Sequence, residues 1–143
     1  MDLDELKDMV DEVKERYSYL VDTDVEEAFM LMKEASSLQA TVDTVVAHFQ
    51  KEYADVERYA KVMQAKISSE ASPQVSKGDR VALQDERCIE AWTTVAKTMK
   101  AVREMEALAK LLGRIYFDCK MVTENGYRRE RVPVGDNRIV GRT

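Results

Sequence analysis

The sequence is poor in the residues from which most enzyme sites are built. Its 143 residues include one histidine, two cysteines, two prolines and five glycines, and only 7% are aromatic. The single histidine, His48, lacks the second and third ligands that a zinc site needs, so we expect it on the surface or boundary of a helix. The motifs GxxxxGK(S/T), GxGxxG and GxSxG are also absent. We therefore expect a non-catalytic protein without cofactor or metal.

Cys88 and Cys119 are the two cysteines, and both lie on the apolar seam of one expected helix. At 1.5 Å per residue they would be about 45 Å apart, too far to form a disulfide within that helix. We expect them to be buried and reduced. The acidic start Met1–Glu5 lacks the positive region of a signal peptide, and no apolar run reaches the roughly 20 residues of a membrane span. These features predict a soluble, cytoplasmic protein with no membrane partner.

The clearest structural signal lies between Cys88 and Cys119. Apolar residues recur there at intervals of three and four, with Glu106 in one seam position and Met105 beside it. This is the heptad pattern of a helix that packs along a nearly parallel or antiparallel partner. The pattern predicts a helix from about Asp79 to Val122, with its seam formed by Cys88, Trp92, Val95, Met99, Val102, Ala109, Leu112, Tyr116 and Cys119.

Two further helices precede this one. The first is expected over residues 3–21, and the second runs from about Asp24 to Ile67. A slip in the apolar spacing beside Ser36-Ser37 predicts a bend or break in the second helix. The stretch Ser68 to Asp79 contains serines, a proline and a glycine, and this composition predicts a loop. We expect Trp92, Tyr53, Tyr59 and Tyr116 in the core.

The end of the chain lacks the apolar periodicity of the helices before it. Asn125-Gly126 is expected to cap the last helix, and residues 127–143 form an aperiodic, arginine-rich tail. The predicted fold is therefore all-α: a long, coiled-coil-like antiparallel hairpin with a short N-terminal helix over residues 1–126, followed by the tail. Because a two-helix hairpin buries only one stripe of each helix, we expect a homo-oligomer.

Charge is distributed unevenly along the chain. Residues 1–60 carry six basic and sixteen acidic residues, residues 61–112 nine and seven, and residues 113–143 seven and four. Basic residues flank the loop, lie along the last helix and recur in the tail. Such residues can bind phosphates. Tyr127 lies off any apolar stripe beside two arginines, which suits stacking on a single strand. The predicted binding residues are Lys61, Lys66, Lys77, Arg80, Arg114, Tyr127, Arg128, Arg129 and Arg131.

The layout over about residues 40–120 resembles bacteriophage recombination mediators of the UvsY type. The similar features are a Tyr/Lys-rich end of a long helix, a Ser-Pro loop, a basic start to the next helix, and a Leu-Leu-Gly-Arg sequence near its end. The residues concerned are Tyr53, Tyr59, Lys61, Lys66, Lys77, Arg80, Asp85 and Leu111 to Arg114. The arginine-rich tail departs from that family's pattern.

The resemblance implies a ring-like oligomer without catalytic residues that binds single-stranded DNA. It also implies a role in loading a RecA-type recombinase onto strands covered by single-strand-binding protein, in the host cytoplasm if a phage encodes the chain. Two other interpretations remain open. One is a structural or adaptor protein, such as a virion or assembly component, whose tail docks on a neighbouring subunit. The other is an inhibitor whose acidic first helices mimic nucleic acid.

Overall fold

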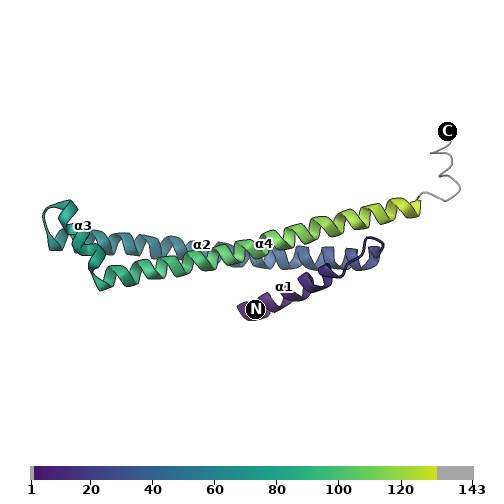
Figure 1. Ribbon diagram of the computed structural model, residues 1–143, viewed down its shortest axis with the longest axis horizontal. Helices are drawn as coiled ribbons and strands as arrows, with labels where there is room; N and C mark the ends of the chain where they lie inside the picture. The colour runs from purple at the N-terminus through teal and green to yellow at the C-terminus, as the bar shows by residue number, and fades with distance from the viewer. Residues whose placement is uncertain (1, 132–143) are drawn as a thin grey trace, which may run out of the picture. The chain divides into compact units, whose positions relative to one another are not determined.

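The computed structural model describes residues 2–131, and these form four helices and no strand. The helices are α1 (Leu3–Ser18), α2 (Val25–Ala71), α3 (Val75–Gln84) and α4 (Glu86–Arg131), as Figure 1 shows. The chain divides into two compact units. Unit 1 combines the residues up to Val42 with those from Leu108 onward, and unit 2 is Asp43–Ala107. In each unit a part of α2 packs antiparallel against a part of α4, which confirms the predicted all-α hairpin.

Unit 1 is a three-helix arrangement in which α1 lies beside α2 and α4 (Figure 1). Each helix turns one apolar stripe inward, at the three-and-four spacing of an amphipathic helix. The buried side chains are Leu6, Val10 and Val13 of α1; Ala28, Leu31, Ala35, Leu38 and Val42 of α2; and Leu112, Ile115 and Cys119 of α4.

Polar contacts fix the C-terminal end of α1 to both partners. Arg16 Nη2 donates to Glu27 Oε1 at 2.6 Å, and Arg16 also forms an ion pair with Glu34 of α2. The Tyr17 hydroxyl donates a hydrogen bond to the Asp118 carboxylate of α4. This bond, and then burial, raises the pKa of Tyr17 from 10.0 to about 12.

Tyr17 should make the packing of α1 sensitive to alkali. The raised pKa means that the folded state holds the phenolic proton more tightly than the unfolded state. The stabilisation is complete below pH 10 and is lost as the pH rises from 10 to about 12, because an ionised Tyr17 would repel Asp118. The melting temperature of the wild type, measured by circular dichroism, should therefore fall as the pH rises from 10 to about 12. We expect Tyr17→Phe to remove the part of this fall that comes from Tyr17. Tyr19→Phe, at an exposed neighbour, should leave it in place; equal pH profiles for the two variants would contradict the assignment.

Unit 2 has a thinner core, formed by two clusters. Ala60 of α2 packs with Ala91 and Val95 of α4, and Ile67 packs with Ala82 of α3 and Cys88 of α4. Trp92 is half-buried against both clusters, and its Nε1 donates to Gln64 Oε1 at 2.9 Å. Along α2, no residue between Val42 and Ala60 is buried, although Phe49, Tyr53 and Val56 are half-buried. The seam of unit 2 is therefore partly open to solvent.

The expected single helix from Asp79 is wrong, because α3 ends at Gln84 and α4 starts at Glu86. Asp85 between them has an extended backbone (φ −74°, ψ 133°), and its Oδ1 accepts a hydrogen bond from the backbone N–H of Arg87 at 2.8 Å. It therefore acts as the N-cap of α4.

The expected loop from Ser68 to Asp79 is also largely helical, because α2 extends to Ala71 and α3 begins at Val75. α3 packs against the end of α2, where Gly78 approaches the backbone carbonyl of Ser68. Ser68 Oγ donates to Asp79 Oδ1 at 2.8 Å. This packing turns most of the expected loop into part of the helical tip.

Two predicted helix ends are wrong, and the predicted break in the second helix is absent. α1 ends at Ser18, α2 continues without a break through Ser36-Ser37, and α4 continues past Asn125-Gly126 to Arg131. Gly126 lies inside α4, where the start of α2 packs so closely that a Cβ would be 2.0 Å from Val25 Cγ2. Residues 127–131 are helical instead of belonging to an irregular tail, and the rest of the expected tail, 132–143, lies outside the described residues.

The predicted seam of α4 is confirmed in its period and shifted in detail. Cys88 and Cys119 are buried and free, as expected. Ala91, Met105 and Ile115 are buried, whereas Trp92, Met99 and Tyr116 are half-buried; His48 is exposed as expected. Of the tyrosines expected in the core, Tyr53 is half-buried, and the prediction for Tyr59 is wrong because its side chain is 58% exposed.

Candidate nucleic-acid interface

Unit 2 carries four of the predicted binding residues, all exposed. Lys61 Nζ forms an ion pair with Glu57 Oε1 at 3.0 Å. Lys66 of α2 and Lys77 and Arg80 of α3 make no ion pair within the part of the chain that the structure describes. The contact between Gly78 and Ser68 joins the two helices that carry these three cations.

Several carboxylates of unit 2 already have partners. Hydrogen bonds from Tyr53 and then Lys61 lower the pKa of Glu57. The Arg87 guanidinium lowers the pKa of Asp85 in the same way, and Asp79 accepts from Ser68. From residue 57 to residue 90 the six basic residues are nevertheless matched by six acidic ones. This surface therefore offers local cations without a net positive charge.

Unit 1 carries the remaining predicted residues, on α4. Arg114 and Arg128 are exposed and form no ion pair among the described side chains. The Arg129 guanidinium donates to the backbone oxygens of Asp22 at 3.2 Å and Asn125 at 3.4 Å. Tyr127 is exposed as predicted. Arg131 is the last residue of α4, and its side chain lies outside the described part.

The side of α4 that carries Arg114 and Arg128 also exposes two apolar residues, which the sequence analysis did not identify. Phe117 is 60% exposed and Met121 is 43% exposed. Together with Lys110, Arg114 and Arg128 they follow a spacing of four, three, four and seven, which places all five on one side of a helix. We name these five residues the α4 stripe. They lie opposite the buried side chains of Leu112, Ile115 and Cys119, and a helical projection of the sequence would have shown this.

The structure thus divides the predicted residues between two units. Lys61, Lys66, Lys77 and Arg80 belong to unit 2, whereas Arg114 and residues 127–131 belong to unit 1. Exposed lysines and arginines can bind phosphates, and exposed aromatic rings can stack on bases. Each surface therefore has the chemistry of a nucleic-acid contact by itself.

Within residues 2–131, no three His, Cys, Asp or Glu side chains gather where they could hold a metal ion, and none of the helices has the length and apolar character of a membrane span. Burial raises the pKa of the Cys88 thiol and raises that of Cys119 to about 11. Both thiols are therefore protonated near neutral pH and are poor nucleophiles.

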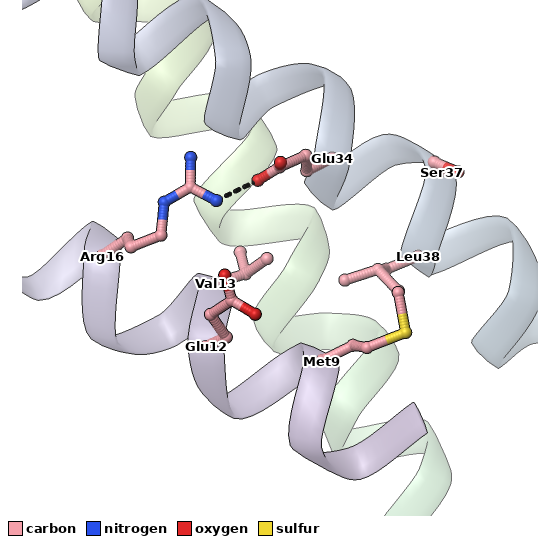
Figure 2. A pocket seen from close by; sticks show the side chains of 7 residues that line it. All are labelled: Met9, Glu12, Val13, Arg16, Glu34, Ser37 and Leu38. Atoms are coloured by element: carbon pink, nitrogen blue, oxygen red, sulfur yellow. Dashed lines mark hydrogen bonds and ion pairs between the residues drawn. The ribbon is translucent and has the colours of Figure 1, made fainter. Parts of the chain in front are cut away.

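A pocket of about 170 Å³ lies between α1 and α2 in unit 1. Figure 2 shows Met9, Glu12, Val13 and Arg16 of α1 facing α2 across it. Because Arg16 is already paired with Glu27 and Glu34, the one cation in the lining is committed to holding α1. The lining therefore has no cation without a carboxylate partner.

Comparison of the chain with protein-family models, with curated proteins and with solved structures finds no match.

Proposed function

We propose that the protein is a non-catalytic, oligomeric helical accessory protein that binds single-stranded DNA. In this proposal it is a recombination mediator of the type that its sequence resembles, and it assists the loading of a recombinase onto strands covered by single-strand-binding protein. The supporting observation is that the predicted cations are exposed and mostly without a carboxylate partner.

The exposure of the predicted cations carries this argument. Seven of the predicted basic side chains are described, all seven are exposed, and among them only Lys61 forms an ion pair. Among the other described basic residues, Arg16, Arg58, Arg87 and Lys100 pair with a carboxylate and the rest do not. Surface cations without such a partner add little to stability, yet they are free to replace the counterions of a phosphate backbone.

The open seam of unit 2 supports the oligomeric part of the proposal. Phe49, Tyr53 and Val56 of α2 are only half-buried, and Tyr59 is mostly exposed. In unit 1 a third helix, α1, completes the core over α2 and α4, whereas unit 2 has only the ten-residue α3 at its tip. A second copy of the chain would bury this apolar surface, as coiled-coil hairpins commonly do.

Fluorescence anisotropy with a labelled single-stranded oligonucleotide tests the DNA-binding part. For about four phosphate contacts the affinity should fall roughly 50-fold between 50 and 200 mM salt. The double variant Lys77→Gln/Arg80→Gln should weaken binding and reduce the salt slope, because it removes two unpaired cations. Arg58→Gln/Lys100→Gln removes the same charge from exposed side chains of unit 2 that already pair with Asp55 and Glu104 and should have little effect. Absence of binding at 50 mM salt would reject the proposal.

A structural or adaptor protein is the second candidate, and a hollow in unit 2 favours it. The hollow measures about 420 Å³ and is lined by Val56, Tyr59 and Met63 of α2 and by Ala91 and Thr94 of α4, among others. Such a groove suits an apolar helix of a partner. Native mass spectrometry with and without an oligonucleotide separates the two functions, because an assembly that takes up no oligonucleotide supports the adaptor.

A further inference from the structure

We infer that the α4 stripe of unit 1 is a binding site for single-stranded nucleic acid, with Phe117 as the ring on which a base stacks. This inference rests on the proposed function. It adds a site that the predicted cation set did not contain, because Phe117, Met121 and Lys110 were not among the predicted binding residues.

Phe117 has no role in the core of unit 1. Its ring is 60% exposed, whereas Ile115 and Cys119, two residues away on either side, are fully buried. Met121 follows one turn later on the same side and is also exposed. Single exposed apolar residues are common on protein surfaces; here, however, the pair lies between Arg114 and Arg128. The arrangement is a small apolar platform with Arg114 one turn before it and Arg128 two turns after it, and with the exposed Glu124 between Met121 and Arg128.

The charge around the platform selects an anionic ligand. Lys110, Arg114, Lys120 and Arg128 are exposed and form no ion pair among the described residues. Of the two carboxylates in the same stretch, Asp118 accepts the Tyr17 hydroxyl and only Glu124 is left facing solvent. Four cations against one carboxylate complement a phosphate backbone.

The length of the stripe also fits a strand. From Lys110 to Arg128 the helix rises about 27 Å at 1.5 Å per residue. A stacked strand that advances 3.4 Å per nucleotide places about eight nucleotides over that distance. The stripe can therefore contact several phosphates while one or two bases reach the platform.

An acidic helix is the main competing ligand, since α1 exposes Asp4, Glu5, Asp8 and Asp11 and a second copy could present them. A stable contact between helices needs an apolar stripe that continues over several turns. On the α4 stripe only Phe117 and Met121 are apolar; Lys110 and Arg114 precede them, and Glu124 and then Arg128 follow on the same side of the helix. Isolated rings between cations are the pattern of single-strand binding, so nucleic acid is the favoured ligand.

The test uses the full chain and a labelled oligothymidylate of twelve nucleotides at 50 mM salt. Because stacking contributes about 1–3 kcal/mol per base, Phe117→Ala should raise the Kd by about five- to 150-fold. Phe117→Leu keeps an apolar side chain without a ring and should also bind weakly, whereas Phe117→Trp should bind well and show tryptophan fluorescence quenched by the strand. Tyr19→Ala is the matched control: Tyr19 is a 77% exposed aromatic residue of unit 1 that lies outside α4, and its loss should leave the Kd unchanged.

The outcomes separate this site from the proposed function. If the wild-type chain binds with the expected salt dependence and both Phe117→Ala and Phe117→Leu bind equally well, the platform is wrong while the proposed function stands. If the wild-type chain does not bind, both are rejected. If Phe117→Ala changes the sedimentation coefficient and leaves the Kd per protomer unchanged, the stripe is an interface between protein chains, which also overturns the inference.

Discussion

Leu112→Ala is expected to lower the free energy of unfolding by about 2–5 kcal/mol. Leu112 is fully buried in unit 1, on the side of α4 that faces the other helices. Its truncation removes apolar contacts and leaves a cavity that helices anchored by Arg16 and Tyr17 cannot easily close. A domain of this size is stable by only about 5–15 kcal/mol, so the loss should be plain in urea denaturation followed by circular dichroism at 222 nm.

Leu83→Ala is the matched control for that measurement. Leu83 undergoes the same chemical truncation, but its side chain is 57% exposed on α3. We expect its free energy of unfolding to stay within about 0.5 kcal/mol of the wild type. Similar losses for Leu112→Ala and Leu83→Ala would mean that the inward stripe of α4 does not form the core of unit 1.

Gly78→Ala and Gly113→Ala should change stability in opposite directions. Alanine is favoured over glycine within a helix by about 1 kcal/mol, so the surroundings decide the sign. At Gly78 a Cβ would lie 2.3 Å from the backbone oxygen of Ser68, and neither helix can move away without breaking the contact between α2 and α3. We expect a net loss of about 1–3 kcal/mol there.

Gly113 faces a softer neighbour. A Cβ at Gly113 would lie 3.1 Å from Gln39 Nε2, the far end of a flexible side chain that can turn aside. We therefore expect Gly113→Ala to raise the free energy of unfolding, by up to about 1 kcal/mol. Urea denaturation of both variants measures the two signs. Stabilisation by Gly78→Ala would show that α3 does not pack against Ser68.

The spacing of apolar residues predicted the class of fold correctly. It did not predict where the helices are interrupted. The three-and-four spacing from Cys88 onward correctly predicted a long helix with an inward seam, because that spacing is a local property of the chain. The break at Asp85 coincides with an extended backbone and a side-chain cap on the N–H of Arg87, a local signal that the apolar spacing does not report. The slip at Ser36-Ser37 does not break α2, because both serines are exposed while Ala35 and Leu38 on either side are buried.

The candidate site was predictable by residue type and less so by position. The predicted lysines and arginines were expected on the surface, and the seven whose side chains the structure describes are exposed. Whether each has a carboxylate partner depends on rotamers and neighbouring helices, as Lys61 and Lys66 illustrate. Phe117 was not identified from the sequence because the prediction followed only the apolar seam and not the opposite side of α4. The sequence contains the necessary spacing, so a projection of both faces would have identified it.

The discontinuity of unit 1 has a consequence for the order in which the chain folds during translation. Unit 2 is one uninterrupted segment that ends at Ala107, whereas unit 1 needs residues on both sides of it. While the ribosome makes the chain from the N-terminus, Leu6, Val10 and Leu31 must wait for Leu112, Ile115 and Cys119 to emerge before their core can close. During that interval the nascent chain displays apolar surface to chaperones and to neighbouring nascent chains.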